Sequence, residues 1–195
     1  MTLRSIADEP DGRRRRSLTS RARIVEAMLD LVREGELSPV AEQVANRAGV
    51  GLRTVFRHFQ DVDSLYREMA LTMEAELMEF ITRPFQGDTP LDRVLELIER
   101  RSQGFERIAP FRRAALANRH RSPFLAGQSD RLSKILRHVL ERELPQSLRD
   151  DWHRLELLDL LLSYEAWDRL RQDQGLTVSE ARSVLERAAR RVLGD

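Results

Sequence analysis

Side chains able to contact nucleic acid share one side of residues 52–59, which read LRTVFRHF. At about 100° per residue, Arg53, Thr54, Arg57 and His58 fall together over an arc of roughly 140°. The apolar residues take the other side: Leu52, Val55, Phe56 and Phe59. Arginine is the usual bidentate partner of guanine, and threonine can bond phosphate or touch a thymine methyl group. The spacing therefore predicts a short helix that offers one face to DNA and buries the other.

The residues before this helix have the turn signals of a helix-turn-helix. Residues 38–59 read SPVAEQVANRAGVGLRTVFRHF, so Ser38 can cap a helix and Pro39 can take its first position. Gly49 suits a left-handed turn, and Ala45 is small where two helices would cross closely. This arrangement leaves the second helix free to enter a major groove. The alternative is a three-helix core with a solvated charged face.

The segments around this motif are also predicted to be helical. The chain has 195 residues, of which 41% are hydrophobic, 33% charged and 6% aromatic. Cap residues and apolar repeats predict an all-α fold of about nine helices, with no strand-like alternation of useful length. Helix starts are expected at these residues: Thr19, Ser38, Asp61, Thr89, Pro110, Ser129, Ser147 and Thr177. The helix from Ser147 is expected to run to Gly175.

Three segments follow from this pattern. Residues 1–18 lack periodicity and are predicted to be a disordered basic arm, residues 19–62 a helix-turn-helix domain, and residues 63–195 a C-terminal helical domain. Within the last, residues 63–83 form a connecting helix. The arm contains Arg13, Arg14, Arg15 and Arg16. Such a run suits phosphate or minor-groove contacts, and a solubilising tail explains it equally well.

Residues 19 to about 71 resemble the DNA-binding domain of the TetR family of transcriptional regulators. The resemblance lies in RIVEAMLDLVREG, SPVAEQVANRAGV, RTVFRHF and the DSL at 63–65, in order and correctly spaced. It implies an all-α homodimer whose first three helices bind double-stranded operator DNA. It also implies a C-terminal ligand-binding and dimerisation domain, and a repressor that a small molecule releases from a pseudo-palindromic operator.

The resemblance also assigns DNA contacts. It places the start of the second helix against phosphate, Arg53 and Thr54 in the groove, and three residues along the edges of the groove: Phe56, Arg57 and His58. The full set is Ser38, Pro39, Val40, Gly51, Leu52, Arg53, Thr54, Phe56, Arg57 and His58. Three positions depart from the family pattern: Gly51 stands where Ser is usual, Phe56 where Tyr is, and Val62 where a Lys touches phosphate. Fewer phosphate contacts are therefore expected.

Residues 155–170, LELLDLLLSYEAWDRL, are apolar over more than half of a helix surface. Such a helix is buried on two sides, so we expect one side in its own core and the other against a second subunit. A central helix of a monomeric bundle is the alternative. The predicted dimer interface comprises Leu158, Leu161, Leu162, Ala181, Leu185 and Ala188.

A ligand site is predicted from aromatic residues accompanied by a few polar groups, the usual lining of small-molecule pockets. The candidates are Phe105, Phe111, Arg112, Ala115, Asn118, Trp152, Tyr164 and Trp167. Taken singly, each aromatic residue is more typical of plain core, because helical spacing predicts core first. The basic cluster within residues 112–121 would favour an anionic ligand, unless it is only a solvated face.

Enzymatic, metal and membrane functions find no support in the sequence. It has no Cys, its 4 His lack metal-ligand spacing, and no phosphate-binding Gly-rich loop or GxSxG motif is present. No enzyme activity, metal or cofactor is expected. Without a long apolar run or a signal-peptide core, a cytoplasmic protein with no membrane contact is expected. The alternative function is a helical enzyme or protein-interaction module that keeps a degenerate helix-turn-helix.

Overall fold

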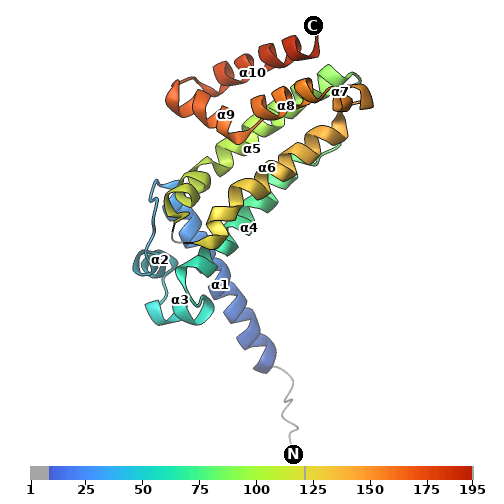
Figure 1. Cartoon of the computed structure of the whole chain (residues 1–195). Coiled ribbons are helices and arrows are strands. Elements are labelled where there is room, and N and C mark those ends of the chain that lie inside the picture. The colour runs from blue at the N-terminus through green and yellow to red at the C-terminus, as the bar shows by residue number, and fades with distance from the viewer. Residues whose placement is uncertain (1–8, 121, 195) are drawn as a thin grey trace, which may run out of the picture. The chain divides into compact units, whose positions relative to one another are not determined.

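The computed structural model describes residues 9–120 and 122–194, and these form ten α-helices and one π-helical turn, with no strand among them (Figure 1). In chain order the elements are α1 (Glu9–Arg33), α2 (Ala41–Ala48), α3 (Leu52–His58), α4 (Val62–Ile81), α5 (Pro90–Asn118), α6 (Pro123–Glu143), α7 (Gln146–Asp150), α8 (Trp152–Leu161), α9 (Tyr164–Asp168), η1 (Arg169–Asp173) and α10 (Val178–Leu193). The predicted all-α fold is confirmed. Within the described residues, no helix is both long enough and apolar enough to span a membrane.

The chain divides into two compact units. The first contains the described residues up to Leu71 together with Pro110–Leu125, and the second contains Thr72–Ala109 and the described residues from Ala126 onward. Helices α4 and α5 therefore contribute to both units. This division does not follow the predicted boundary at residue 62, because the first turns of α4 and the end of α5 pack with the helix-turn-helix.

In the first unit, α1 packs against α2 and α3 around a core that includes Ile24, Met28, Val44, Val55 and Phe59. The turn between α2 and α3 forms as predicted, because Gly49 adopts a φ of 62° in the left-handed region.

Helix α1 begins earlier than predicted. Its first residue is Glu9 instead of a residue after Thr19, so the backbone of residues 9–18 is helical where disorder was expected. Two properties explain the correction. Pro10 lies in the first turn, where a missing N–H costs nothing, and arginine is a good helix former.

The helix starts predicted at Pro110 and Ser129 are also wrong. Helix α5 continues through Pro110, where a new helix was expected, and the two compact units divide at this proline. Helix α6 begins at Pro123 instead of near Ser129, because the Ser122 hydroxyl accepts a hydrogen bond of 3.0 Å from the Leu125 N–H and caps the helix. The caps at Asp61, Thr89 and Thr177 are confirmed, since each side chain accepts a hydrogen bond from the N–H three residues later.

In the second unit, the single helix predicted to end at Gly175 is four short elements, α7, α8, α9 and η1. The breaks occur at N-cap side chains. Asp151 accepts from the Arg154 N–H at 3.3 Å, and Ser163 accepts from the Ala166 N–H at 3.1 Å. Because the apolar pattern was interpreted as one long helix, neither cap was predicted from the sequence.

A buried arginine stabilises the second of these breaks. Arg101 is 1% exposed, and its Nη1 donates to the Leu162 carbonyl oxygen at 2.7 Å, while its Nη2 donates to the Leu136 carbonyl oxygen. Burial lowers the pKa of Arg101 to about 10, so the guanidinium is still charged at pH 7. It therefore provides two charge-assisted hydrogen bonds between helices that are far apart in sequence.

Candidate nucleic-acid interface

Helix α3 presents two arginines to solvent and anchors its opposite side in the core of the first unit. Val55 and Phe59 are each 2% exposed, whereas the side chains of Arg53 and Arg57 are exposed and Thr54 is half-buried. Because the buried pair is spaced i, i+4, it forms one stripe along a helix of only seven residues. The two arginines are therefore held at a surface by a fixed scaffold.

The outer surface of α3 is more apolar than predicted. Leu52 is 36% exposed and Phe56 is 48% exposed, so neither belongs to the buried side to which the helical wheel assigned them. Phe56 lies about 100° from Val55 around the helix, which turns it away from the core. Exposed apolar side chains in this position can contact thymine methyl groups or the sugars of the backbone.

His58 differs from its predicted role as an open donor or acceptor. The ring is half-buried, and its Nε2 is covered and finds no hydrogen-bond partner among the described residues. Burial lowers the pKa of His58 below its ordinary value, and the charges of Arg57 and Arg21 lower it further. The lowered pKa favours the neutral imidazole at pH 7.

Arg21 of α1 holds the last turn of α3, a role that sequence analysis missed. Its Nη1 donates to the His58 carbonyl oxygen at 2.8 Å and its Nη2 to Glu68 Oε2 at 2.7 Å. The guanidinium also lies over the Phe59 ring, 4.3 Å from the centroid. These partners are 37 and 47 residues away in sequence, so no local pattern indicates the contact.

The segment before α2 corrects another prediction. The helix begins at Ala41 with Val40 as its N-cap residue, so Ser38 does not cap it and Pro39 is not its first residue. Instead, Gln43 Oε1 accepts a hydrogen bond of 2.8 Å from the Val40 N–H. The Ser38 hydroxyl donates to Asn118 Oδ1 at 3.0 Å, Pro39 is buried, and Val40 is 52% exposed. The predicted DNA contacts of the arm belong to side chains outside the described residues: Arg13, Arg14, Arg15 and Arg16.

The predicted ligand-site residues are divided between the two units. Four belong to the first unit: Phe111, Arg112, Ala115 and Asn118. Four belong to the second unit: Phe105, Trp152, Tyr164 and Trp167. Buried Asn118 donates through Nδ2 to the Leu37 carbonyl oxygen at 2.7 Å, which ties α5 to the loop before α2.

The aromatic residues of the second unit are mainly core. Phe105 and Tyr164 are buried and pack edge to face, with ring centroids 5.5 Å apart. Trp167 is buried and its Nε1 donates to Glu106 Oε1 at 2.9 Å. Trp152 corrects the prediction, because it is 62% exposed and stacks on His153 instead of lining a cavity.

Most residues predicted for the dimer interface are buried within the second unit. The buried residues are Leu158, Leu162, Ala181 and Leu185, whereas Leu161 and Ala188 are half-buried. The inward stripe of α8 runs through Leu155, Leu158 and Leu162 at helical spacing, which turns other leucines outward. The exposed apolar residues on α8 and α10 are instead Leu157 (49%), Leu160 (66%) and Val184 (46%).

This chain is similar to known proteins in its fold and not in its sequence. No protein-family model matches the sequence, and no curated protein matches it. A TetR transcriptional regulator from Rhodococcus sp. RHA1 has 22% identity and a TM-score of 0.57, with 90% of this chain and 96% of that chain covered.

Two further structures match over a similar extent. Another transcriptional regulator from Rhodococcus sp. RHA1 has 20% identity and a TM-score of 0.63, covering 89% of this chain and 95% of that chain. The multidrug binding protein EbrR, complexed with imidazole, has 18% identity and a TM-score of 0.58, covering 96% of this chain and 97% of that chain. Likeness at these identities is a likeness of fold. The chain therefore has the all-α fold of the TetR-type transcriptional regulators.

Proposed function

We propose that this protein is a DNA-binding transcriptional regulator and that α3 is its recognition helix. The observation that carries the proposal is the geometry of α3, which exposes Arg53 and Arg57 while Val55 and Phe59 are buried. The fold shared with transcriptional regulators supports the same assignment. A bidentate arginine–guanine contact contributes about 1–3 kcal/mol of discrimination between bases, which suits Arg53 as the sequence-reading residue.

Rigid support makes these arginines suitable for reading a sequence. Arg21 fixes the last turn of α3, and Arg23 Nη2 donates to the Ala48 carbonyl oxygen at 2.5 Å at the end of α2. Both reading side chains therefore extend from a helix whose backbone is held at each end of the motif. A helix placed in this way can present the same side chains to each half-site without reordering, which limits the entropy cost of binding.

The proposal includes a homodimer formed through the outer faces of α8 and α10, which lie side by side in Figure 1. The exposed side chains of Leu157, Leu160 and Val184 would be buried there. A symmetric dimer would place its two recognition helices about 34–36 Å apart, which matches successive major grooves on one side of a pseudo-palindromic operator.

We further propose that the protein is a cytoplasmic repressor that a small molecule releases from DNA. One structure with the same fold is a multidrug binding protein complexed with imidazole, which supports a small-molecule effector. Repression and release would follow if the effector binds only the form that cannot hold both half-sites.

A gel shift with the DNA upstream of the protein's own gene tests DNA binding. We expect a complex that resists scrambled competitor DNA and weakens steeply between two salt concentrations, because phosphate contacts release counterions. A helical enzyme or protein-interaction module with a degenerate helix-turn-helix would bind both DNAs equally weakly.

A further inference from the structure

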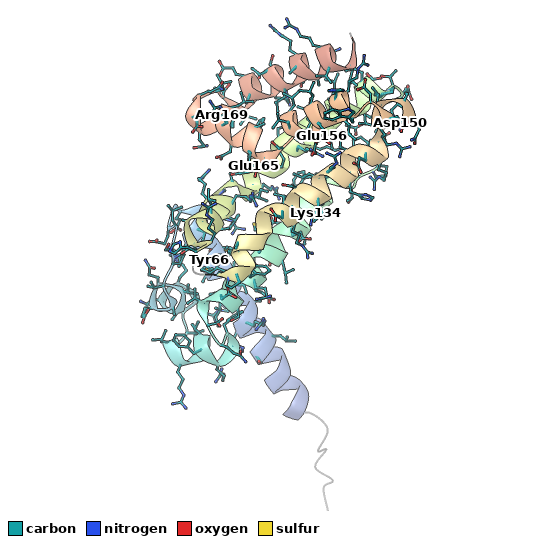
Figure 2. All side chains as sticks on the ribbon, in the orientation of Figure 1. Tyr66, Lys134, Asp150, Glu156, Glu165 and Arg169 are labelled. Carbon is teal, nitrogen blue, oxygen red and sulfur yellow. The ribbon has the colours of Figure 1, made fainter. Side chains whose placement is uncertain are left out.

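A cavity of about 350 Å³ lies within the first unit, beside the N-termini of α2 and α4. This volume is within the range of small-molecule pockets, about 300–1,000 Å³. Apolar walls come from Val40, Ala41, Phe56, Val62 and Tyr66. Tyr66, labelled on α4 in Figure 2, is 5% exposed, and Phe56 belongs to the recognition helix. Two aromatic rings therefore line a space large enough for a small organic molecule.

Hydrogen bonds fix two walls of this cavity. Ser38 donates to Asn118 Oδ1 at 3.0 Å, and the Ser122 hydroxyl donates to the Asp63 carboxylate. Asn118 and Ser122 are each 3% exposed, so each link has one buried partner. The cavity is thus largely formed before a ligand enters, which reduces the ordering cost of binding.

The charge of the lining selects the kind of ligand. Glu42 and Asp63 line the cavity, and none of the described residues that line it is Lys, Arg or His. Arg67 Nη2 contacts Asp63 Oδ2 at 3.3 Å from outside the lining, and no basic side chain among the described residues pairs with Glu42. Two carboxylates repel phosphate and other anions and attract a cation.

We propose that this cavity binds small organic cations that carry a protonated amine on a flat apolar body, and that the bound cation competes with DNA. The amine would lie near Asp63 and Glu42, with the apolar body between Phe56 and Tyr66. This site belongs entirely to the first unit and is separate from the aromatic core around Phe105 and Tyr164.

The competition with DNA rests on the proposed function. Val40 and Phe56 line the cavity, are 52% and 48% exposed, and lie in the two segments assigned to the DNA backbone. A molecule that fills the cavity would occupy the rim that the phosphate chain must approach. DNA release at this site therefore requires no conformational change that passes along the chain.

The first experiment is an NMR titration of the full chain without DNA, using 2-(1-naphthyl)ethylamine as the probe. We expect saturable amide shifts confined to residues 38–42, 56, 62–66 and 118–122. The matched alcohol, 2-(1-naphthyl)ethanol, should bind about tenfold or more weakly, because it lacks a charge-assisted hydrogen bond. The matched anion, 1-naphthylacetate, should not bind. Shifts elsewhere, no saturable shifts, or equal binding of the alcohol would overturn the proposal.

A charge-removing variant tests the cavity directly. Asp63→Asn keeps an acceptor for Ser122 but removes the carboxylate charge, so the affinity for the amine should fall about tenfold. Glu79→Gln is the control, because it removes one negative charge from the same helix at a residue outside the cavity lining. Unchanged affinity in Asp63→Asn, or equal losses in both variants, would contradict the assigned site.

The second experiment titrates the same amine into the protein bound to its operator. We expect the apparent Kd for DNA to rise in proportion to amine concentration, with about tenfold more amine needed for Asp63→Asn. Amine binding in the NMR titration with no effect on DNA would refute the competition. A protein that binds no specific DNA would refute the proposed function, and the NMR titration would still decide whether the cation site exists.

Discussion

Replacing Arg21 with methionine tests whether α3 is held in place by a side chain from α1. Methionine keeps an apolar stem of similar length but removes the donors to the His58 carbonyl oxygen and to Glu68. The change leaves every exposed residue of α3 untouched. A loss of DNA binding in this variant would therefore come from the position of α3 and not from a missing DNA contact.

The contacts of Arg21 allow the expected cost to be worked out. Arg21 and Glu68 are each 38% exposed as side chains, so their ion pair contributes at most about 1 kcal/mol. The hydrogen bond from a charged donor to the His58 carbonyl contributes about 1.5–3 kcal/mol, and the stacking over Phe59 about 0.5–1 kcal/mol. Contacts of one side chain are not additive, so we expect Arg21→Met to lower the free energy of unfolding by about 2–3 kcal/mol.

Urea unfolding and operator binding should be measured on the same variants. Arg83→Met is the matched control, because Arg83 is exposed, pairs with Glu79 one turn away and lies over the Phe80 ring. We expect it to cost less than about 1 kcal/mol and to leave DNA binding unchanged. If Arg21→Met costs no more than this control, or binds the operator as tightly as the unaltered protein, Arg21 does not position α3.

Three further predictions concern the dimer, the turn and the recognition helix. Leu160→Glu should dissociate the dimer in sedimentation without unfolding the protomer, since Leu160 is 66% exposed. Leu158→Ala should instead lower the free energy of unfolding by about 2–5 kcal/mol, because Leu158 is buried. An unfolded Leu160→Glu protomer, or a Leu158→Ala variant that dissociates without losing stability, would refute the proposed outer face of α8. In thermal denaturation, Gly49→Ala should lower the free energy of unfolding by about 1–2 kcal/mol, because the φ of Gly49 is left-handed. Gly51→Ser should raise it by up to about 1 kcal/mol, because Gly51 has an ordinary φ of −70° and open space at the Cβ position. A Gly49→Ala variant that is more stable than the unaltered protein would contradict this prediction. Because the folded state lowers the pKa of His58, the unfolded state binds more protons, so the free energy of unfolding should fall as the pH drops below the ordinary pKa of 6.5. His58→Gln should make this fall shallower, and identical pH profiles for the variant and the unaltered protein would refute the role of His58.

Local chemistry predicted the turn of the helix-turn-helix and several helix starts, but not the start of α2, where the cap expected at Ser38 does not form. Caps at Asp61, Thr89 and Thr177 and the left-handed Gly49 depend on residues within a few positions of each other, and all four are confirmed. Helical periodicity also predicted that Val55 and Phe59 are buried while Arg53 faces solvent. The same reasoning failed at Phe56, because a helix of two turns buries a narrower stripe than a wheel of equal halves assumes.

Sequence patterns could not predict contacts between residues that are far apart in the chain. Arg101 donates to a carbonyl oxygen 61 residues away and stabilises the break after α8, and the predicted continuous helix missed that break. The apolar pattern of α8 correctly indicated a helix with apolar residues on two sides. It could not show that Leu158 faces inward and Leu160 outward, since that choice depends on where the neighbouring helices pack.

The most direct test of the account compares Arg53→Ala with the unaltered protein on operator and scrambled DNA at one salt concentration. If α3 reads the sequence through Arg53, the variant should lose about 1–3 kcal/mol on the operator, roughly fivefold to 150-fold in affinity, and relax its preference at one base pair in each half-site. Its affinity for scrambled DNA should change little. Equal weakening on both DNAs would show that Arg53 only contacts phosphate, and the absence of any preference in the unaltered protein would contradict the proposal that it is a sequence-specific regulator.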